Sequence, residues 1–212
     1  SGRALEFDGV SDRFYTSQIS GITEFADGES WTFATWIKFY STGFQFFVGR
    51  HSETTPHIGL HNQDYIMFRA DNGNYYKFDS TQTDASPGSA PLITNVWYRL
   101  VITAEDNILT CYLNGQQHGS TITTSTNDTS NATVFPGSAM IFSGWGAPYE
   151  SGGSHNHFTD GAMSDGQIWN TAWTQSDVTF DYLNPESLAL NNGGTSLTES
   201  NLKLWYPMQD GH

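Results

Sequence analysis

The sequence is short of cysteine, of positive charge and of long apolar runs. Its one cysteine, Cys111, excludes a disulfide within the chain of 212 residues. Eight Lys and Arg stand against 22 Asp and Glu, a formal net charge of −14, so no basic stripe is available for nucleic acid phosphates or anionic membranes. No apolar run reaches the roughly 18 residues of a membrane-spanning helix. These shortages argue against nucleic acid partners and membrane insertion.

Aromatic residues, in contrast, are plentiful. They make up 15% of the chain, slightly more than the 14% contributed by all charged residues. This balance is typical of a chain that buries much apolar surface and solvates its exterior with Ser, Thr, Asn and Gly. Since all-β sandwiches run to roughly 200–250 residues without dividing, we predict a single domain over residues 1–212.

Short alternating or continuous apolar segments predict β-strands from end to end of the chain. Residues 96–122 alternate, turn and alternate back through Leu109, Cys111 and Leu113, which predicts an antiparallel meander with Cys111 in the core. Residues 31–39 are apolar or β-branched on both faces, as expected of a strand buried inside a sandwich.

Three further elements are predicted around these strands. Residues 65–78 contain Asn72-Gly73 between two apolar segments, which indicates a hairpin. Thr174 with Asp177 three residues later is a variant of the capping box and predicts a short helix over residues 174–182. A final strand over residues 202–208 is expected to return beside the first.

Several of these segments resemble a laminin-G-like jelly roll of the concanavalin A-like superfamily. The resemblance implies an all-β, two-sheet antiparallel sandwich with one short helix near the C-terminal third. Gly166 stands where an apolar residue is common in that family. The matching segments are Ala4-Leu5-Glu6-Phe7-Asp8-Gly9, residues 31–38, Trp97 to Thr103 followed by Cys111 to Gly115, and residues 161–173.

The C-terminal third is also similar to segments of structural proteins from marine bacteriophages, through residues 181–186, 191–195 and 205–208. This resemblance implies an appendage such as a tail fibre, at the virion surface or elsewhere outside the cell. It keeps open a second interpretation, in which the chain is a structural virion domain that packs against other virion subunits.

The sequence does not favour catalysis. The superfamily contains glycoside hydrolases and polysaccharide lyases, which need two carboxylates at a fixed separation or a positioned His and Tyr. The Glu-x-Asp signature of one hydrolase family, with its second Glu on the same strand face, is absent, and Glu53, Glu105 and Glu150 lie in or beside predicted turns. We therefore predict a non-catalytic module that binds a glycan or a cell-surface receptor.

One loop combines the groups that a sugar site needs, an aromatic platform beside amide and imidazole partners. An alternative is that its aromatic residues pin a long loop to the sandwich, and a second is that the His-x-His pair binds a transition metal. The candidate ligand-binding residues are Trp145, Tyr149, His155, Asn156 and His157.

A structural calcium ion is the predicted cofactor, because hard cations take carboxylate and carbonyl oxygens from loops and members of the superfamily often carry one. Asp8 follows the first strand and Asp210 follows the last, so the two carboxylates meet if these strands are adjacent. The alternative is that both are ordinary turn residues.

Overall fold

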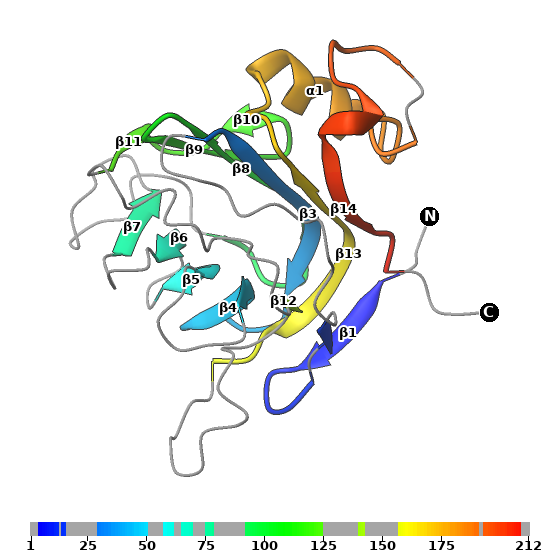
Figure 1. Cartoon of the computed structure of the whole chain (residues 1–212). Coiled ribbons are helices and arrows are strands. Elements are labelled where there is room, and N and C mark those ends of the chain that lie inside the picture. Colours follow the sequence, from blue (N-terminus) through cyan, green and yellow to red (C-terminus); the bar gives the residue numbers. More distant parts are fainter. Residues whose placement is uncertain are drawn as a thin grey trace.

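The computed structural model of the chain describes residues 4–12, 14–15, 29–50, 57–61, 65–69, 75–78, 92–124, 140–142, 157–190 and 193–208. Within these ranges two antiparallel sheets pack face to face, one of eight strands and one of six (Figure 1). This arrangement confirms the predicted all-β sandwich. None of the helices in these ranges is long and apolar enough to cross a membrane.

The eight-stranded sheet consists of six strands in one path and two further strands that pair with members of it. Strand β11 (Ile122–Thr123) pairs with β9, and β14 (Leu202–Tyr206) pairs with β13. The other strands follow in spatial order: β1 (Leu5–Asp8), β13 (Asp160–Trp169), β3 (Trp31–Phe39), β8 (Trp97–Glu105), β9 (Ile108–Leu113) and β10 (Gln116–Gln117).

The six-stranded sheet lies against the inner face of the first (Figure 1). Its strands in spatial order are β2 (Phe14–Tyr15), β12 (Met140–Phe142), β4 (Gln45–Arg50), β5 (His57–His61), β6 (Tyr65–Arg69) and β7 (Tyr75–Phe78). The predicted hairpin is confirmed, since β6 and β7 pair from Ile66↔Phe78 to Arg69↔Tyr75.

The main core lies between the sheets and follows the predicted alternation. In β8 the inward positions Leu100, Ile102 and Ala104 are fully buried, and in β9 Cys111 is buried beside them. Burial raises the pKa of the Cys111 thiol well above its ordinary value. The meander prediction is confirmed, because β9 pairs antiparallel with β8 and both β10 and β11 then pair with β9.

The sequence suggested that the last strand would lie beside the first, but the structure places it elsewhere. Strand β13 is long enough to hold both on the edge away from β3: β1 pairs with Asp160 to Met163, and β14 pairs with Gly166 to Trp169. The two strands therefore lie end to end, with Leu5 and Tyr206 at the facing ends.

A bulge in β13 separates these two pairings. The register of β13 against β3 shifts between Ser164 and Gln167, and Asp165 has a φ of 52°. Such an irregularity re-aims a side chain and leaves no regular inward position at the next residue. Gly166, where the family commonly has an apolar residue, is therefore accounted for by the bulge.

Helix α1 (Gln175–Leu183) covers one end of the outer face of the eight-stranded sheet (Figure 1). Its capping box is as predicted: Thr174 accepts from the amide of Asp177, and the Asp177 carboxylate accepts from the amide of Thr174. A second apolar cluster lies between the helix region and the sheet. It contains Ala34, Val101, Tyr112, Trp169, Trp173, Val178 and Leu188.

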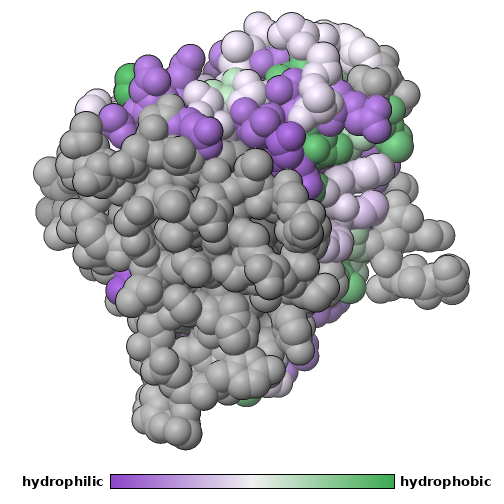
Figure 2. All heavy atoms as spheres, viewed as in Figure 1, coloured by the Kyte–Doolittle hydropathy of each residue, from purple (hydrophilic) through white to green (hydrophobic). Residues whose placement is uncertain are grey.

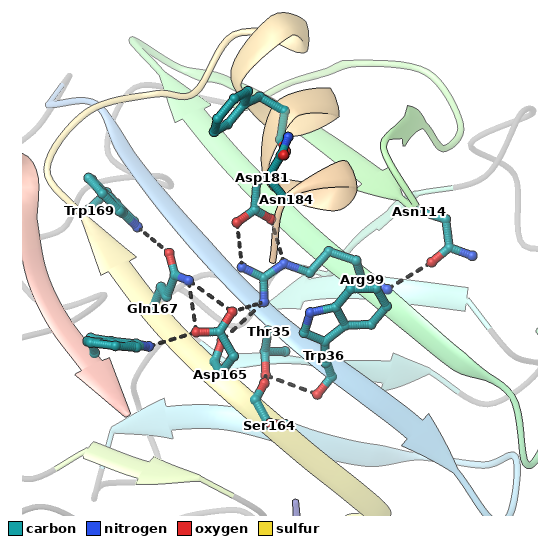
Figure 3. A network of polar contacts seen from close by, with 12 residues as sticks. Thr35, Trp36, Arg99, Asn114, Ser164, Asp165, Gln167, Trp169, Asp181 and Asn184 are labelled. Atoms are coloured by element: carbon teal, nitrogen blue, oxygen red, sulfur yellow. Dashed lines mark hydrogen bonds and ion pairs between the residues drawn. The ribbon is translucent and has the colours of Figure 1, made fainter. Parts of the chain in front are cut away.

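A fully buried guanidinium joins this helix to the sheet (Figure 3). Arg99 donates from Nε and Nη2 to the two carboxylate oxygens of Asp181, at 2.6 and 3.0 Å. Its Nη1 lies 2.9 Å from the carboxylate of Asp165 at the bulge. Burial opposes the charge of Arg99, but Asp181 and Asp165 outweigh it and hold the pKa of the guanidinium above its ordinary value.

The carboxylate of Asp165 also accepts hydrogen bonds from two further side chains. Asp165 accepts from Nε2 of Gln167 at 2.9 Å and from Nε1 of Trp205 at 2.7 Å, while Gln167 in turn accepts from Nε1 of Trp169 (Figure 3). The network thus links α1, β8, β13 and β14, and its satisfied hydrogen bonds compensate the cost of burying three charges.

Substituting Asp181→Ala is expected to lower the free energy of unfolding by about 3–5 kcal/mol, because the buried guanidinium of Arg99 then keeps only one of its two carboxylate partners. Thr174→Ala in the same helix removes a cap and is expected to cost about 1 kcal/mol. Urea unfolding of both variants measures the difference. Equal losses for the two would contradict the account of the network.

Candidate functional site

Of the five residues predicted to bind ligand, the structure describes His157. Its ring packs edge-on against Phe44, with centroids 4.5 Å apart, and lies 5.8 Å from Phe46. His61 in β5 contacts the same Phe44 ring at 5.3 Å. Two half-buried imidazoles therefore flank one phenyl ring where β4 begins and β5 ends, in the middle of the six-stranded sheet. Trp145, Tyr149, His155 and Asn156 lie outside the described residues.

Main-chain and side-chain hydrogen bonds fix the segment that begins at His157. The His157 carbonyl accepts from the amide of Phe46 at 2.9 Å, and the Thr159 hydroxyl donates to the Phe46 carbonyl at 2.8 Å. The amide of Asp160 donates to Oε1 of Gln45, a side chain buried between the sheets. Residues 157–160 thus cross from one sheet to the other on a fixed path, so the carboxyl end of the candidate loop has a fixed position.

Asp8, one of the two predicted calcium ligands, lies at the end of β1 opposite Asp160. Its Oδ1 accepts from the amides of Val10, Ser11 and Asp12 at 2.8, 2.8 and 2.9 Å. These backbone bonds, led by that of Ser11, lower the pKa of Asp8 from 3.8 to about 2. Oδ2 accepts from the Ser11 hydroxyl at 3.3 Å.

The other predicted ligand, Asp210, lies outside the described residues. The prediction rested on β1 and β14 lying side by side, but the two strands lie end to end, with Asp8 at the end of β1 away from β14. In the described ranges no three His, Cys, Asp or Glu side chains lie close enough to hold a metal ion. A calcium site that uses Asp8 remains a prediction.

A group of exposed and half-buried side chains that the sequence analysis did not predict lies on the outer face of the eight-stranded sheet, beyond the part that α1 covers. We call it the outer-face platform and define it as Glu6, Lys38, Tyr40 and Trp97. The signal was present in the sequence as alternating Trp36, Lys38 and Tyr40 along one strand face. The same alternation also fits the strand over residues 31–39 that is predicted to be buried on both faces, so it does not by itself indicate an open face.

The sequence matches one known protein family. Residues 9–179 match the family described as the Concanavalin A-like lectin/glucanases superfamily. No curated protein matches the sequence.

Solved structures of similar fold differ widely in sequence. A candidate carbohydrate-binding protein from Bacteroides ovatus is 15% identical, with a TM-score of 0.63 over 98% of this chain and 52% of its own. A heptameric SAP-like pentraxin from Limulus polyphemus is 13% identical, with a TM-score of 0.58 over 84% of this chain and 80% of its own.

The binding domain of botulinum neurotoxin serotype D is 15% identical, with a TM-score of 0.55 over 84% of this chain and 41% of its own. The chain thus spans about half the length of the Bacteroides protein and less of the toxin domain. At these identities the likeness establishes the fold alone.

The carboxyl group of Asp8 is expected to titrate near pH 2 rather than near 3.8, because its charged form accepts three amide hydrogen bonds. A folded-state pKa below the unfolded value means that this group stabilises the turn above pH 3.8 and loses its contribution as the pH falls toward 2. NMR titration of the side-chain carboxyl carbon measures it. Ser11→Ala, which keeps the amide, should change the value little; titration near 3.8 in the unmodified chain would contradict the described turn.

Proposed function

This chain belongs to the concanavalin A-like lectin/glucanases superfamily, and from that membership we propose that it is a non-catalytic module that binds carbohydrate. The observation that carries the proposal is the family match over residues 9–179. The candidate carbohydrate-binding protein of B. ovatus and the toxin binding domain, which share the fold, are consistent with a recognition role.

Three of the described carboxylates are engaged in contacts within the structure, which favours binding over hydrolysis at their positions. Glycoside hydrolysis needs two carboxyl groups that are both open to the sugar. Asp165 and Asp181 face a common point, but both are buried and bound to Arg99, and Oδ1 of Asp8 is engaged by three turn amides. None of these groups is placed to act as a catalytic acid or base.

The loop that ends at His157 is the proposed contact region, because its carboxyl end is fixed against Phe44 and Phe46 while its sequence supplies Trp145 and Tyr149. Fixing one end of a loop reduces the entropy that ligand binding must overcome. Aromatic rings then offer faces for sugar rings, and His155 and Asn156 offer polar partners.

A glycan array probed with the intact chain tests the proposal, followed by calorimetry on each glycan that binds. Trp145→Ala and Tyr149→Ala are expected to weaken binding at the loop about tenfold or more, which corresponds to about 1.4 kcal/mol. His61→Ala, which also removes an aromatic contact to Phe44 but lies outside the loop, is the matched control and should change affinity little.

Two results would count against the proposal. Release of reducing ends from polysaccharides incubated with the chain would indicate a hydrolase. Absence of glycan binding together with stable oligomers in light scattering would favour a structural domain that packs against copies of itself or other virion subunits.

We also propose that the module is displayed outside the cell or on a virion surface, and that calcium has a structural role at Asp8. The strong acidity and the resemblance to phage structural segments support the setting, and Oδ2 of Asp8 supports the cation. A ligand that binds the native state raises its apparent stability by mass action. Calcium should therefore raise Tm relative to EDTA, and Asp8→Asn should abolish the shift; identical Tm values would refute the calcium role.

A further inference from the structure

Three of the four residues of the outer-face platform lie along one row of paired residues that crosses four strands. Glu6 in β1 pairs with Ala162 in β13, Ala162 pairs with Lys38 in β3, and Lys38 pairs with Trp97 in β8. These four paired residues lie on the face opposite the main core, because the residues next to them in the chain face inward: Phe7, Met163, Ile37 and Tyr98. Small Ala162 leaves the larger side chains of Glu6 and Lys38 standing on either side of it.

Contacts among the platform side chains hold them in place. The ammonium of Lys38 lies 4.9 Å from the ring centroid of Tyr40 and 5.3 Å from that of Trp97, so it is positioned between two aromatic rings. The Tyr40 hydroxyl donates to the carboxylate of Glu6. Aromatic rings, a cation and an anion are thereby held in fixed positions on the outer face of the sheet.

The turn before Trp97 is equally well fixed. The amide of Asn95 donates to the Phe39 carbonyl, and the amide of Ile93 donates to the Tyr98 hydroxyl at 2.8 Å. Trp97 nevertheless keeps 37% of its surface exposed, which is unusual for so large an aromatic side chain. A rigid, exposed Trp is a typical anchor of a recognition surface.

At the other end the platform meets the helix region. Trp36, the outer-face residue before Lys38 on β3, packs against Tyr182 of α1 with ring centroids 5.9 Å apart. The described surface in the view of Figure 2 is mostly hydrophilic or intermediate, with small separate hydrophobic areas. The open part of the sheet face is therefore bounded on one side by α1.

We propose that the outer-face platform is a second carbohydrate site, separate from the loop that ends at His157, and that it takes uncharged pyranose oligosaccharides. The inference rests on the proposed carbohydrate-binding function. The apolar face of a sugar ring would stack on Trp97, while the Lys38 ammonium would donate to ring hydroxyls and the Glu6 carboxylate would accept from them.

The charges of the platform favour a neutral ligand over an anionic one. Lys38 and Glu6 offset each other locally, while the whole chain carries −14 and repels polyanions. The combination of one exposed ring with two opposite charges also suits the apolar faces and hydroxyl rims of a sugar. The centres of protein–protein interfaces are depleted in Lys and Glu, so the two charged side chains of the platform argue against a protein partner at this position.

Calorimetry with cellohexaose, laminarihexaose and N-acetylchitohexaose as probes, and hexaguluronate as the anionic comparison, tests the inference. At least one neutral hexasaccharide should bind the intact chain, and Trp97→Ala should weaken that binding tenfold or more. Lys38→Met and Glu6→Gln, which keep the side-chain size, should weaken it by smaller factors. Hexaguluronate should bind more weakly than the neutral probe.

Two controls separate the platform from the loop and from a general loss of structure. Ile93→Ala, at a neighbouring side chain with 62% exposure, should leave affinity within about twofold. Trp145→Ala should leave the platform site intact. Unchanged Tm for Trp97→Ala would show that the variant is folded.

Neutral binding that survives Trp97→Ala but is lost in Trp145→Ala would overturn the second site and leave the proposed function standing. Binding of hexaguluronate in preference to the neutral probes would overturn the ligand class. Failure of the intact chain to bind any probe or array glycan would reject both proposals.

Discussion

The guanidinium of Arg99 is the group on which the outer half of this structure depends. An unpaired charge in a protein interior is very costly, so a buried arginine requires carboxylates at fixed positions. Asp181 supplies one from helix α1, and Asp165 supplies the other from a bulge in β13. Because these partners come from distant parts of the chain, the same charge holds α1 against the sheet and stabilises the bulge in β13.

This arrangement divides the outer sheet face into a closed part and an open part. On the closed side, Val178 of α1 packs in a small apolar cluster with Trp169 and Trp173. On the open side, Trp97 lies two residues from Arg99 on the same face of β8, and Trp36 lies with its ring 5.9 Å from the Arg99 guanidinium carbon. The position of the outer-face platform thus follows from that of the buried charge.

The sequence predicted the elements whose signal is local. Alternation predicted the meander around Cys111, Asn72-Gly73 indicated the hairpin of β6 and β7, and Thr174 with Asp177 predicted the start of α1. It did not predict that β14 would share one edge of β13 with β1, because strand order depends on pairing between distant segments. Arg99 carried no sign of its burial, since a charged residue at an alternating position is usually exposed and its two partners lie 66 and 82 residues away.

The candidate sites divide in the same way. His157 proved to be fixed by Phe44 and Phe46, contacts that no spacing in the sequence reveals. The outer-face platform was hidden because its members come from β1, β3 and β8, and only the register of these strands aligns them. Roles for Trp145, Tyr149, His155, Asn156 and Asp210 stay predictions from the sequence.

A bound sugar is expected to change the surroundings of the platform while the buried network beside it stays unchanged. NMR spectra of the tryptophan indole N–H groups, recorded while the neutral hexasaccharides are added in turn, observe both at once, because Trp169 and Trp205 donate into the network. We predict that the Trp97 signal moves with ligand concentration and that the Trp169 and Trp205 signals do not. A stationary Trp97 signal in the presence of a sugar that binds the chain would contradict the claim.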